Sequence, residues 1–458
     1  MRLTLEELAA KLEELIQQPD AATSLAALLE EVQPFDLAEA LQQLSEEESR
    51  RALATLEPGQ AAEVMEHLEY YAQYRLLHHM EPADARQIMD HMPADMVADL
   101  IGSIHPRQAE QLLKLLPPQD VTTIRTLAEY PENSAGGRMT VDFISVRQSM
   151  TAEQVLTHIR KVGAEAETIS YIYVVDGAGR LVGVVSLREL IMAAPKDRVS
   201  EFLNSSVVSV PASMDQEEVA NIVSDYDFVA VPVVAADNRL IGIITVDDVI
   251  DVIQEEATED VYRMGATSVP EETLGMPFLR QVWALAKPRL PWLVGLLFLE
   301  LGSSFIVTTF SGYVTPTVAA LLAVFTVVMA GETGNAATQS LAVVVRGLAT
   351  GEIKPKDMPR VVLREALVGL VVGLIAGATL MLGGWLWQGN LIFGLAAGLA
   401  LMANLFVAKV LGGLFPVVIY RLGIDPAVAS GPFITTLTDN TSMLIYYSVA
   451  AVVLRNFG

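Results

Sequence analysis

Hydrophobic positions divide the chain into three stretches with different periods. Up to about residue 131, apolar residues recur three and four positions apart in short runs, which is typical of amphipathic helices. Pro34, Pro58, Pro82 and Pro106 in this stretch are each separated by 24 residues. Because proline fits the first turn of a helix, a fixed period of this length predicts stacked pairs of short helices. Residues 1–131 are therefore expected to form an all-α helical solenoid.

The same spacing links Leu41, Met65, Met89 and Leu113, which are expected to pack between neighbouring repeats. Most carboxylates of the repeats are expected on a solvated outer face. The N-terminal run MRLTLEELAAKLEELI predicts an amphipathic helix and not a signal peptide, because Glu and Lys interrupt its apolar runs.

Beyond residue 131 the pattern changes to one of strands. Tyr171–Val175 and Val229–Val234 are rich in β-branched residues, and each is followed by a polar turn, a second strand and a helix. Gly183 and Gly242 mark corresponding positions in the two copies, 59 residues apart. Residues 132–253 therefore predict a duplicated α/β module.

This module resembles a tandem pair of CBS domains, most clearly in Gly242-Ile243-Ile244-Thr245-Val246-Asp247-Asp248. The resemblance implies that Thr245 and Asp248 bind the ribose of a nucleotide such as ATP, and a helix N-terminus favours a phosphate. The first copy departs from this pattern, with Ser186 and Glu189 at these positions. A structural alternative is equally open: Thr245 caps the helix and Asp248 is its partner in the first turn.

Six carboxylates lie along the helix that begins after the second copy, and we call them the acidic stripe. They are Asp247, Asp251, Glu255 and Glu259, which are four residues apart, and the flanking pair Glu256 and Asp260. Like charges at this spacing destabilise a helix by about 0.2–0.5 kcal/mol per pair. A hard divalent cation would neutralise them. The alternative is a solvated face whose repulsion is screened by salt. We expect the stripe to sense a cation such as Mg²⁺.

Five apolar segments fill the last part of the chain, residues 281–458. They are Leu290–Phe310, Val314–Val345, Ala366–Trp387, Leu391–Tyr420 and Pro432–Leu454. Because about 20 residues cross the hydrocarbon core, these segments predict an α-helical transmembrane bundle in contact with membrane lipid. The second and fourth segments are longer and are expected to tilt, kink or break, the second at polar residues 331–335. Residues 254–280 are expected to form a connecting helix.

Basic residues alternate between the connections of these segments. Arg280, Lys287 and Arg289 precede the first segment and five basic residues lie in the second connection, whereas the first and third connections carry none. The positive-inside rule then places the N-terminus in the cytoplasm and the C-terminus outside, in a bacterial-type inner membrane.

Polar residues within apolar segments are candidates for an ion path, because charge in a bilayer is costly. The candidates are Asn335, Gln339, Thr435, Thr436 and Asp439. Carboxylate and amide oxygens suit Mg²⁺, Ca²⁺ or Mn²⁺ better than copper or zinc. We expect Asp439 to bind the ion and the other four to line the pore. Glu300 and Lys409 are instead expected in an interhelical ion pair or near a membrane face.

Composition narrows the function further. The chain has 458 residues, a mean hydropathy of +0.39 and a net charge of −25. Residues 1–286 carry 48 acidic and 20 basic residues, which disfavours nucleic-acid binding. The absence of cysteine excludes thiol catalysis and disulfides. No nucleophile–base pair or phosphate-binding loop is apparent, so an enzyme is not expected.

The order of these parts resembles the MgtE family of magnesium channels. Matching motifs are Tyr130–Thr140, Glu255–Asp260, Gly334–Gln339 and Pro432–Asp439. The resemblance implies a homodimeric Mg²⁺-selective channel with five transmembrane helices per subunit and a pore ion at Asp439. It also implies that cytoplasmic Mg²⁺ bridges the acidic domains and holds the connecting helix over the pore.

Two positions depart from the family pattern. Ala337 replaces the second glycine of Gly-Asn-x-Gly-x-Gln, and Ser442 replaces the glycine of Asp-x-x-Gly. Both bear on ion selectivity and conduction more than on the fold. Two other functions stay open: a transporter of another divalent cation such as Co²⁺, or a non-conducting membrane sensor regulated through the CBS module.

Overall fold

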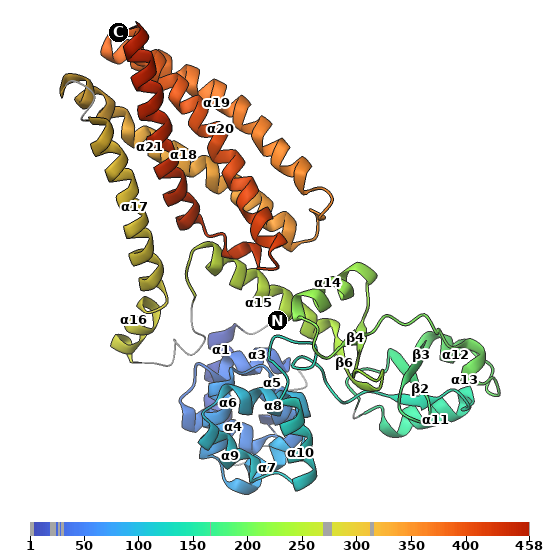
Figure 1. Cartoon of the computed structure of the whole chain (residues 1–458). Coiled ribbons are helices and arrows are strands. Elements are labelled where there is room, and N and C mark those ends of the chain that lie inside the picture. Colours follow the sequence, from blue (N-terminus) through green and yellow to red (C-terminus); the bar gives the residue numbers. More distant parts are fainter. Residues whose placement is uncertain are drawn as a thin grey trace. The chain divides into compact units, whose positions relative to one another are not determined.

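The computed structural model describes residues 4–18, 24–25, 28, 32–164, 166–268, 277–311 and 316–457. Contacts divide the chain into two compact units, Met1–Gln254 and Glu255–Gly458. Figure 1 shows the elements of both units. The first unit holds the helical repeats and the two α/β copies, and the second holds the long apolar helices.

The repeats of the first unit are pairs of short helices. They are α3 (Pro34–Leu41), α4 (Glu46–Thr55), α5 (Pro58–Glu66), α6 (Tyr70–His79), α7 (Pro82–Met89), α8 (Ala94–Ser103), α9 (Pro106–Leu113) and α10 (Pro118–Leu127), preceded by α1 (Leu5–Ile16). The four equally spaced prolines are the first residues of α3, α5, α7 and α9, as predicted. The four apolar residues with the same spacing are buried in the core between the helices.

The two α/β copies share the order strand, helix, strand, strand, helix, and one additional short helix follows in the first copy. The first consists of β1 (Ser145–Arg147), α11 (Ala152–Val162), β2 (Tyr171–Val175), β3 (Leu181–Ser186), α12 (Leu187–Met192) and α13 (Val199–Phe202). The second consists of β4 (Val210–Pro211), α14 (Gln216–Tyr226), β5 (Ala230–Val234), β6 (Leu240–Thr245) and α15 (Val246–Met264). In each sheet the middle strand pairs in parallel with the first strand and antiparallel with the last. The predicted duplicated module is confirmed.

Gly183 and Gly242 occupy matching registers, opposite Val174 in one sheet and Val233 in the other. A Cβ on Gly183 would lie 2.9 Å from the Asn204 carbonyl oxygen, and one on Gly242 would lie 2.8 Å from the Thr140 carbonyl oxygen. Close approach of another backbone therefore requires glycine at both positions.

The connecting segment differs from the prediction of one helix through residues 254–280. Helix α15 ends at Met264, and Ala266 has a left-handed backbone with a φ of 53°. A new helix, α16 (Phe278–Ala286), begins after Pro277. Left-handed backbone ends a right-handed helix, so the continuous connecting helix is wrong beyond Met264. Residues 269–276 lie outside the described residues.

The second unit contains long helices that pack along one another (Figure 1). They are α17 (Arg289–Ser311), α18 (Pro316–Ala349), α19 (Met358–Gln388), α20 (Leu391–Arg421) and α21 (Gly431–Phe457). Small residues allow close helix contacts: a Cβ on Gly377 of α19 would lie 2.6 Å from the carbonyl oxygen of Gly398 on α20. The expected break at residues 331–335 is wrong, because α18 is helical throughout this stretch. Its glycines and polar residues interrupt the hydrophobic pattern without interrupting the backbone hydrogen bonds.

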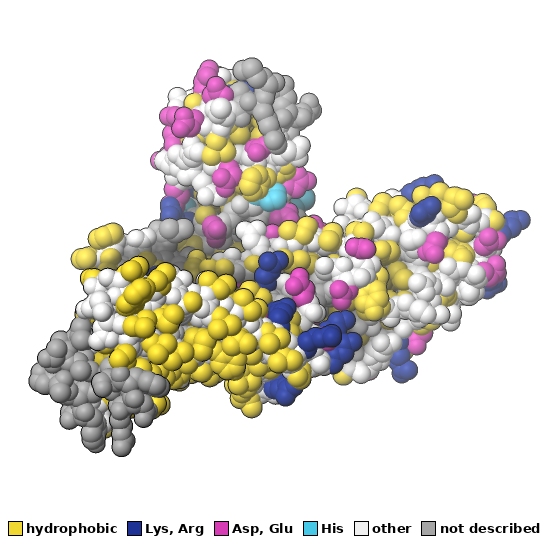
Figure 2. Space-filling view, turned by 90° about the horizontal axis from the view of Figure 1, so that it is seen from above, with side chains coloured by type: hydrophobic (Ala, Val, Ile, Leu, Met, Phe, Trp, Pro, Cys, Tyr) yellow, Lys and Arg dark blue, Asp and Glu magenta, His cyan; other side chains and the backbone are white. Residues whose placement is uncertain are grey.

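The surface of the bundle is apolar. Figure 2 shows hydrophobic side chains covering one face of it almost continuously. Within the described residues, α17, α19 and α20 are long and apolar enough to cross a membrane by length and composition. Helices α18 and α21 carry the polar residues of the candidate ion path and do not meet this criterion in their described parts.

Candidate functional site

Asp439 lies in the middle of α21 and is half-buried. The hydroxyls around it are engaged within the helix: Thr435 and Thr436 both donate to the Pro432 carbonyl oxygen at 2.9 Å, and Thr438 donates to the Ile434 carbonyl oxygen at 2.9 Å. No cationic side chain forms an ion pair with Asp439 in the part of the chain that the structure describes. The carboxylate therefore has no protein counter-ion among the residues that the structure describes.

A second carboxylate lies on the neighbouring helix. Asn440, next to Asp439, donates from Nδ2 to the Leu299 carbonyl oxygen of α17 at 3.2 Å. A Cβ on Gly302 would collide with Asn440 Oδ1, so the two helices are in close contact here. Glu300 lies within this contact region and interacts electrostatically with Asp439. No ion pair of Glu300 is found among the described residues, so of its two expected arrangements only a position near a membrane face stays a prediction.

Helix α18 meets α21 one turn from Asp439. A Cβ on Gly334 would lie 3.3 Å from Thr435 Cγ2, so these backbones approach closely. Asn335 and Gln339 are four residues apart on the exposed face of α18. The structure thus brings α17, α18 and α21 together around the predicted pore residues.

Lys409 of α20 is buried at 4% exposure and belongs to a polar network between helices. Its Nζ lies 3.2 Å from Gln339 Oε1, 3.4 Å from the Ala336 carbonyl oxygen and 3.4 Å from Ser340 Oγ. The Ser340 hydroxyl in turn donates to Glu365 Oε2 at 2.8 Å. Lys409 therefore contacts α18 directly and reaches Glu365 of α19 through Ser340, and no ion pair of Lys409 is found among the described residues.

Sequence reasoning missed Glu365, which was placed just outside the third apolar segment. The structure extends α19 back to Met358, so that Glu365 lies in the helix at 6% exposure. Its second charged neighbour is Arg364, at 3.3 Å. The sequence did contain a signal for it. Glu365 directly precedes the apolar run, and a transmembrane helix commonly extends beyond its apolar residues.

The two departures from the family pattern are both interior. Ala337 is fully buried against Gly412 of α20, on the side of α18 opposite Asn335. Ser442 is fully buried on α21, and its backbone oxygen accepts from Asn404 Nδ2 at 3.4 Å. Both residues therefore contact neighbouring helices, and neither is on the exposed face that Asn335 and Gln339 share.

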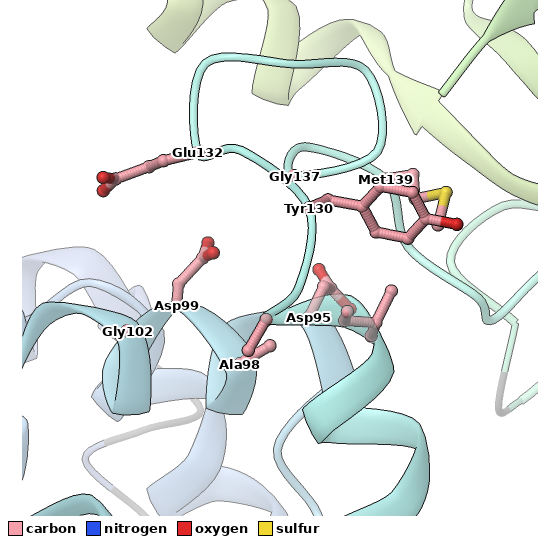
Figure 3. Close-up of a pocket in the computed structure, with 10 residues that line it drawn as sticks. Asp95, Ala98, Asp99, Gly102, Tyr130, Glu132, Gly137 and Met139 are labelled. Carbon is pink, nitrogen blue, oxygen red and sulfur yellow. The ribbon is translucent and has the colours of Figure 1, made fainter. Parts of the chain in front are cut away.

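A pocket of ≈ 180 Å³ lies between α8, α10 and the segment 130–139 of the first unit. Figure 3 shows the carboxylates of Asp95 and Asp99 directed toward the loop that carries Gly137 and Met139, whereas Glu132 points away. Burial raises the pKa of Asp95 to about 7 and that of Asp99 to about 6. Asp95 Oδ1 has no hydrogen-bond partner within the described residues. The expectation of a solvated outer face is wrong for these two carboxylates.

Asp247 of the acidic stripe and its neighbour Asp248 are close to carboxylates from other elements of this unit. Burial, followed by the charges of Asp248 and Asp247, raises the pKa of Glu167 to about 7. The charge of Asp248 adds to the rise that burial causes in the pKa of Asp95 and of Asp99. The charge of Asp247 adds in the same way to the rise that burial causes in the pKa of Glu66. Sequence reasoning missed this convergence, because the contributing segments are far apart in the chain.

The candidate nucleotide residues form a cap. Thr245 is buried at 4% exposure and its hydroxyl donates to Asp248 Oδ2 at 2.8 Å. Burial raises the pKa of Asp248, and the hydrogen bonds from Thr245 oppose that rise. Ser186 and Glu189 form the matching capping box at the start of α12. Side-chain contacts typical of helix capping are therefore present in both copies, and nucleotide binding by Thr245 and Asp248 stays a prediction.

The remaining stripe residues lie on the later turns of α15, where Asp251, Glu255 and Glu259 are exposed. Arg263 forms ion pairs with Glu259 and with Asp425, which follows α20. Burial, followed by the charge of Asp425, raises the pKa of Asp260 to about 6. Asp425 also escaped sequence reasoning, because it lies in a short connection with no other charge beside it.

No three acidic or histidine side chains converge closely enough to hold a metal ion alone in the described ranges. The stripe and the pocket instead offer one or two carboxylates at a time. This arrangement fits Mg²⁺, which dehydrates reluctantly and often meets protein through one or two carboxylates and retained waters.

A repeat-and-sheet unit is joined to an apolar helical bundle whose carboxylates Asp439 and Glu300 have no cationic partner among the described residues. This combination defines a multi-pass membrane transport protein. Three family models match in order: the MgtE intracellular N domain at residues 32–133, the CBS domain at 135–196 and 199–255, and the divalent cation transporter MgtE at 326–449. The chain belongs to the MgtE family of divalent cation transporters, as its motifs predicted.

Relatives and solved structures agree with this assignment. The magnesium transporter MgtE of Enterococcus faecalis is 42% identical over 74% of this chain and 73% of its own length. That of Thermus thermophilus is 42% identical over 74% of each chain. A crystal structure of the cytosolic domain of the Mg²⁺ channel MgtE in complex with ATP covers 53% of this chain and 99% of its own, with 42% identity and a TM-score of 0.51. The soluble part of a magnesium transporter gives 33% identity and a TM-score of 0.53 over 56% of this chain and 100% of its own.

Proposed function

We propose that the chain is a Mg²⁺-selective channel whose ion path passes Asp439. The observation that carries the proposal is the pair Asp439 and Glu300. These carboxylates interact on adjoining helices, and neither has a cationic partner among the described residues. Uncompensated charge within a membrane bundle is costly, so a mobile cation is expected to supply the missing charge. We propose Mg²⁺ as this cation, because the relatives are named magnesium transporters.

This path would be lined by Asn335, Gln339, Thr435 and Thr436. Amide and hydroxyl oxygens can hold the waters of a hydrated Mg²⁺, which resists losing them. We propose that two subunits form the pore, that the N-terminus is cytoplasmic and that the C-terminus is outside. Basic residues in the entry flank and the second connection support this orientation.

Regulation is proposed to use the carboxylates of the first unit and of α15. Their mutual repulsion disfavours a compact arrangement when cytoplasmic Mg²⁺ is low. Rising Mg²⁺ would neutralise them and shift the population toward a closed state, because the cation binds that state more tightly. Arg263 and Asp425 support a part for α15 in this closure, because they tie the end of α15 to the connection before α21.

Uptake of Mg²⁺ into proteoliposomes tests the transport proposal against its alternatives. We expect uptake down the Mg²⁺ gradient with no requirement for a proton or Na⁺ gradient. Dependence on either gradient would show a coupled transporter instead. Faster uptake of Co²⁺ than of Mg²⁺ would overturn the ion assignment. Folded protein that carries neither ion would indicate a sensor.

A further inference from the structure

Helix α16 presents an apolar face that no described residue of its own unit covers. Phe278, Leu279, Val282 and Trp283 follow the helical spacing of one face, and their exposures are 75%, 80%, 49% and 63%. None of the nine residues of α16 is buried. Exposed apolar patches of this kind mark contacts with lipid or with another protein.

The opposite side of α16 is cationic. Arg280 and Lys287 are seven residues apart and therefore lie on the same side of the helix, and both are exposed. No acidic residue occurs between Pro277 and Leu299. An apolar face with Trp and Phe opposite a basic one is typical of helices that lie in the membrane interface and contact anionic lipid.

The position of α16 brings it to a membrane surface. It ends at Ala286, and α17 begins at Arg289 as an apolar helix able to cross a membrane. Three residue steps span at most about 11 Å, and each interfacial layer of a bilayer is about 5–8 Å thick. The C-terminal end of α16 is therefore held near the headgroups. This argument depends on α17 crossing the membrane and not on which ion the protein carries.

We propose that α16 is an interfacial helix that binds the leaflet at which α17 begins, which is the cytoplasmic leaflet in the proposed orientation. Its apolar face inserts among the acyl chains, Trp283 lies near the headgroup level, and Arg280 and Lys287 contact anionic lipid headgroups. A second copy of this chain could cover the same face, and the first experiment below separates the two occupants.

Quenching of Trp283 fluorescence tests insertion. The full chain and its Trp283→Phe variant are reconstituted in vesicles of phosphatidylcholine and phosphatidylglycerol, and the difference in emission gives the Trp283 signal. We expect acyl chains brominated near the headgroup to quench this signal more than chains brominated near the terminal methyl, and aqueous acrylamide to have little effect. Quenching by acrylamide alone would show a water-facing helix. Protection from both quenchers would show a protein contact, and either result overturns the proposal.

Charge reversal tests the headgroup contact. In vesicles that mix the two lipids, the ratio of Trp283 quenching by brominated phosphatidylglycerol to quenching by brominated phosphatidylcholine is expected to exceed unity. Arg280→Glu with Lys287→Glu should lower this ratio to unity. Lys354→Glu with Lys356→Glu makes the same charge change in an exposed connection outside α16 and should leave the ratio unchanged. A ratio of unity in the unmodified chain, or an equal fall in both double variants, would overturn the proposal.

Discussion

The ammonium of Lys409 lies 3.2 Å from Oε1 of Gln339, which joins α20 to the exposed face of α18. Through Ser340 the same network reaches the buried carboxylate of Glu365 on α19. Three helices of the bundle are therefore held by one charged network beside a predicted pore residue. A buried network of this kind is sensitive to the loss of any one member.

Lys409→Met should destabilise the bundle, because it leaves Glu365 buried with less compensation. Removing one partner of a buried ion pair costs about 3–5 kcal/mol. The loss is expected to be smaller here, because Lys409 reaches Glu365 through Ser340 and Arg364 lies beside that carboxylate. The full chain in detergent should show a lower thermal unfolding temperature than the unmodified protein. Adding Glu365→Gln should recover part of the loss. The exposed control Lys354→Met should have no effect, and an equal loss in the double variant would contradict the network.

Glu255→Gln or Glu259→Gln should weaken closure by cytoplasmic Mg²⁺, because each removes a carboxylate that the cation neutralises. A loss of about 1.4 kcal/mol would raise the Mg²⁺ concentration for half-block about tenfold. Mg²⁺ block of currents in excised membrane patches measures the shift. Glu153→Gln, an exposed carboxylate on α11, is the matched control. Unchanged block in both stripe variants would refute regulation through the stripe.

Stability of the first unit should depend on pH through Asp95. Burial raises its pKa from 3.8 to about 7, while Thr140 donates to it and Asp248 and Asp99 add negative charge. The folded state therefore binds the proton more tightly than the unfolded state. The resulting stability is fully present below pH 3.8 and is lost as the pH rises through about 7.

Asp95→Asn should remove the loss of stability that the first unit shows as the pH rises. In Mg²⁺-free buffer near pH 8, amides of α8 should exchange hydrogen more slowly in the variant than in the unmodified full chain. Near pH 5 the difference should shrink, because Asp95 is then largely protonated. Glu57→Gln provides an exposed control on the same repeats. Equal exchange at both pH values would contradict the assigned pKa.

ATP binding should distinguish the two interpretations of Thr245. If its hydroxyl contacts a ribose, Thr245→Val should lower the affinity of the full chain for ATP measured by calorimetry. If it only caps α15, the variant should lose about 1 kcal/mol of stability and keep its affinity. Ser186→Ala removes the corresponding cap of α12 and controls for the capping loss.

Local patterns predicted the elements well, for reasons visible in particular residues. The equally spaced prolines open α3, α5, α7 and α9 because proline suits the first helical turn. Gly183 and Gly242 fall in matching registers because each lies against another backbone. The predictions were wrong where glycine and polar residues were taken to break a helix, and where one continuous helix was expected in the connecting segment. The glycines of residues 331–335 do not break α18, and a left-handed Ala266 follows the end of α15.

The candidate site was predicted only in part, because convergence of distant segments is not a local pattern. Asp439 was singled out by its polar neighbours, but its closeness to Glu300 depends on the packing of α17 against α21. In the sequence, Asp95 and Asp99 look like the other carboxylates of the repeats. Only the folded structure shows that segment 130–139 lies against them. Glu365 and Asp425 likewise acquire partners only in the folded bundle.

The central claim is tested most directly by Mg²⁺ uptake into proteoliposomes containing Asp439→Asn. Glu352→Gln, which changes an exposed carboxylate in the connection before α19, is the matched control. We predict that Asp439→Asn reduces uptake to the level of protein-free liposomes, with an unchanged unfolding temperature, while Glu352→Gln transports normally. Normal uptake by folded Asp439→Asn would contradict an ion path through this residue.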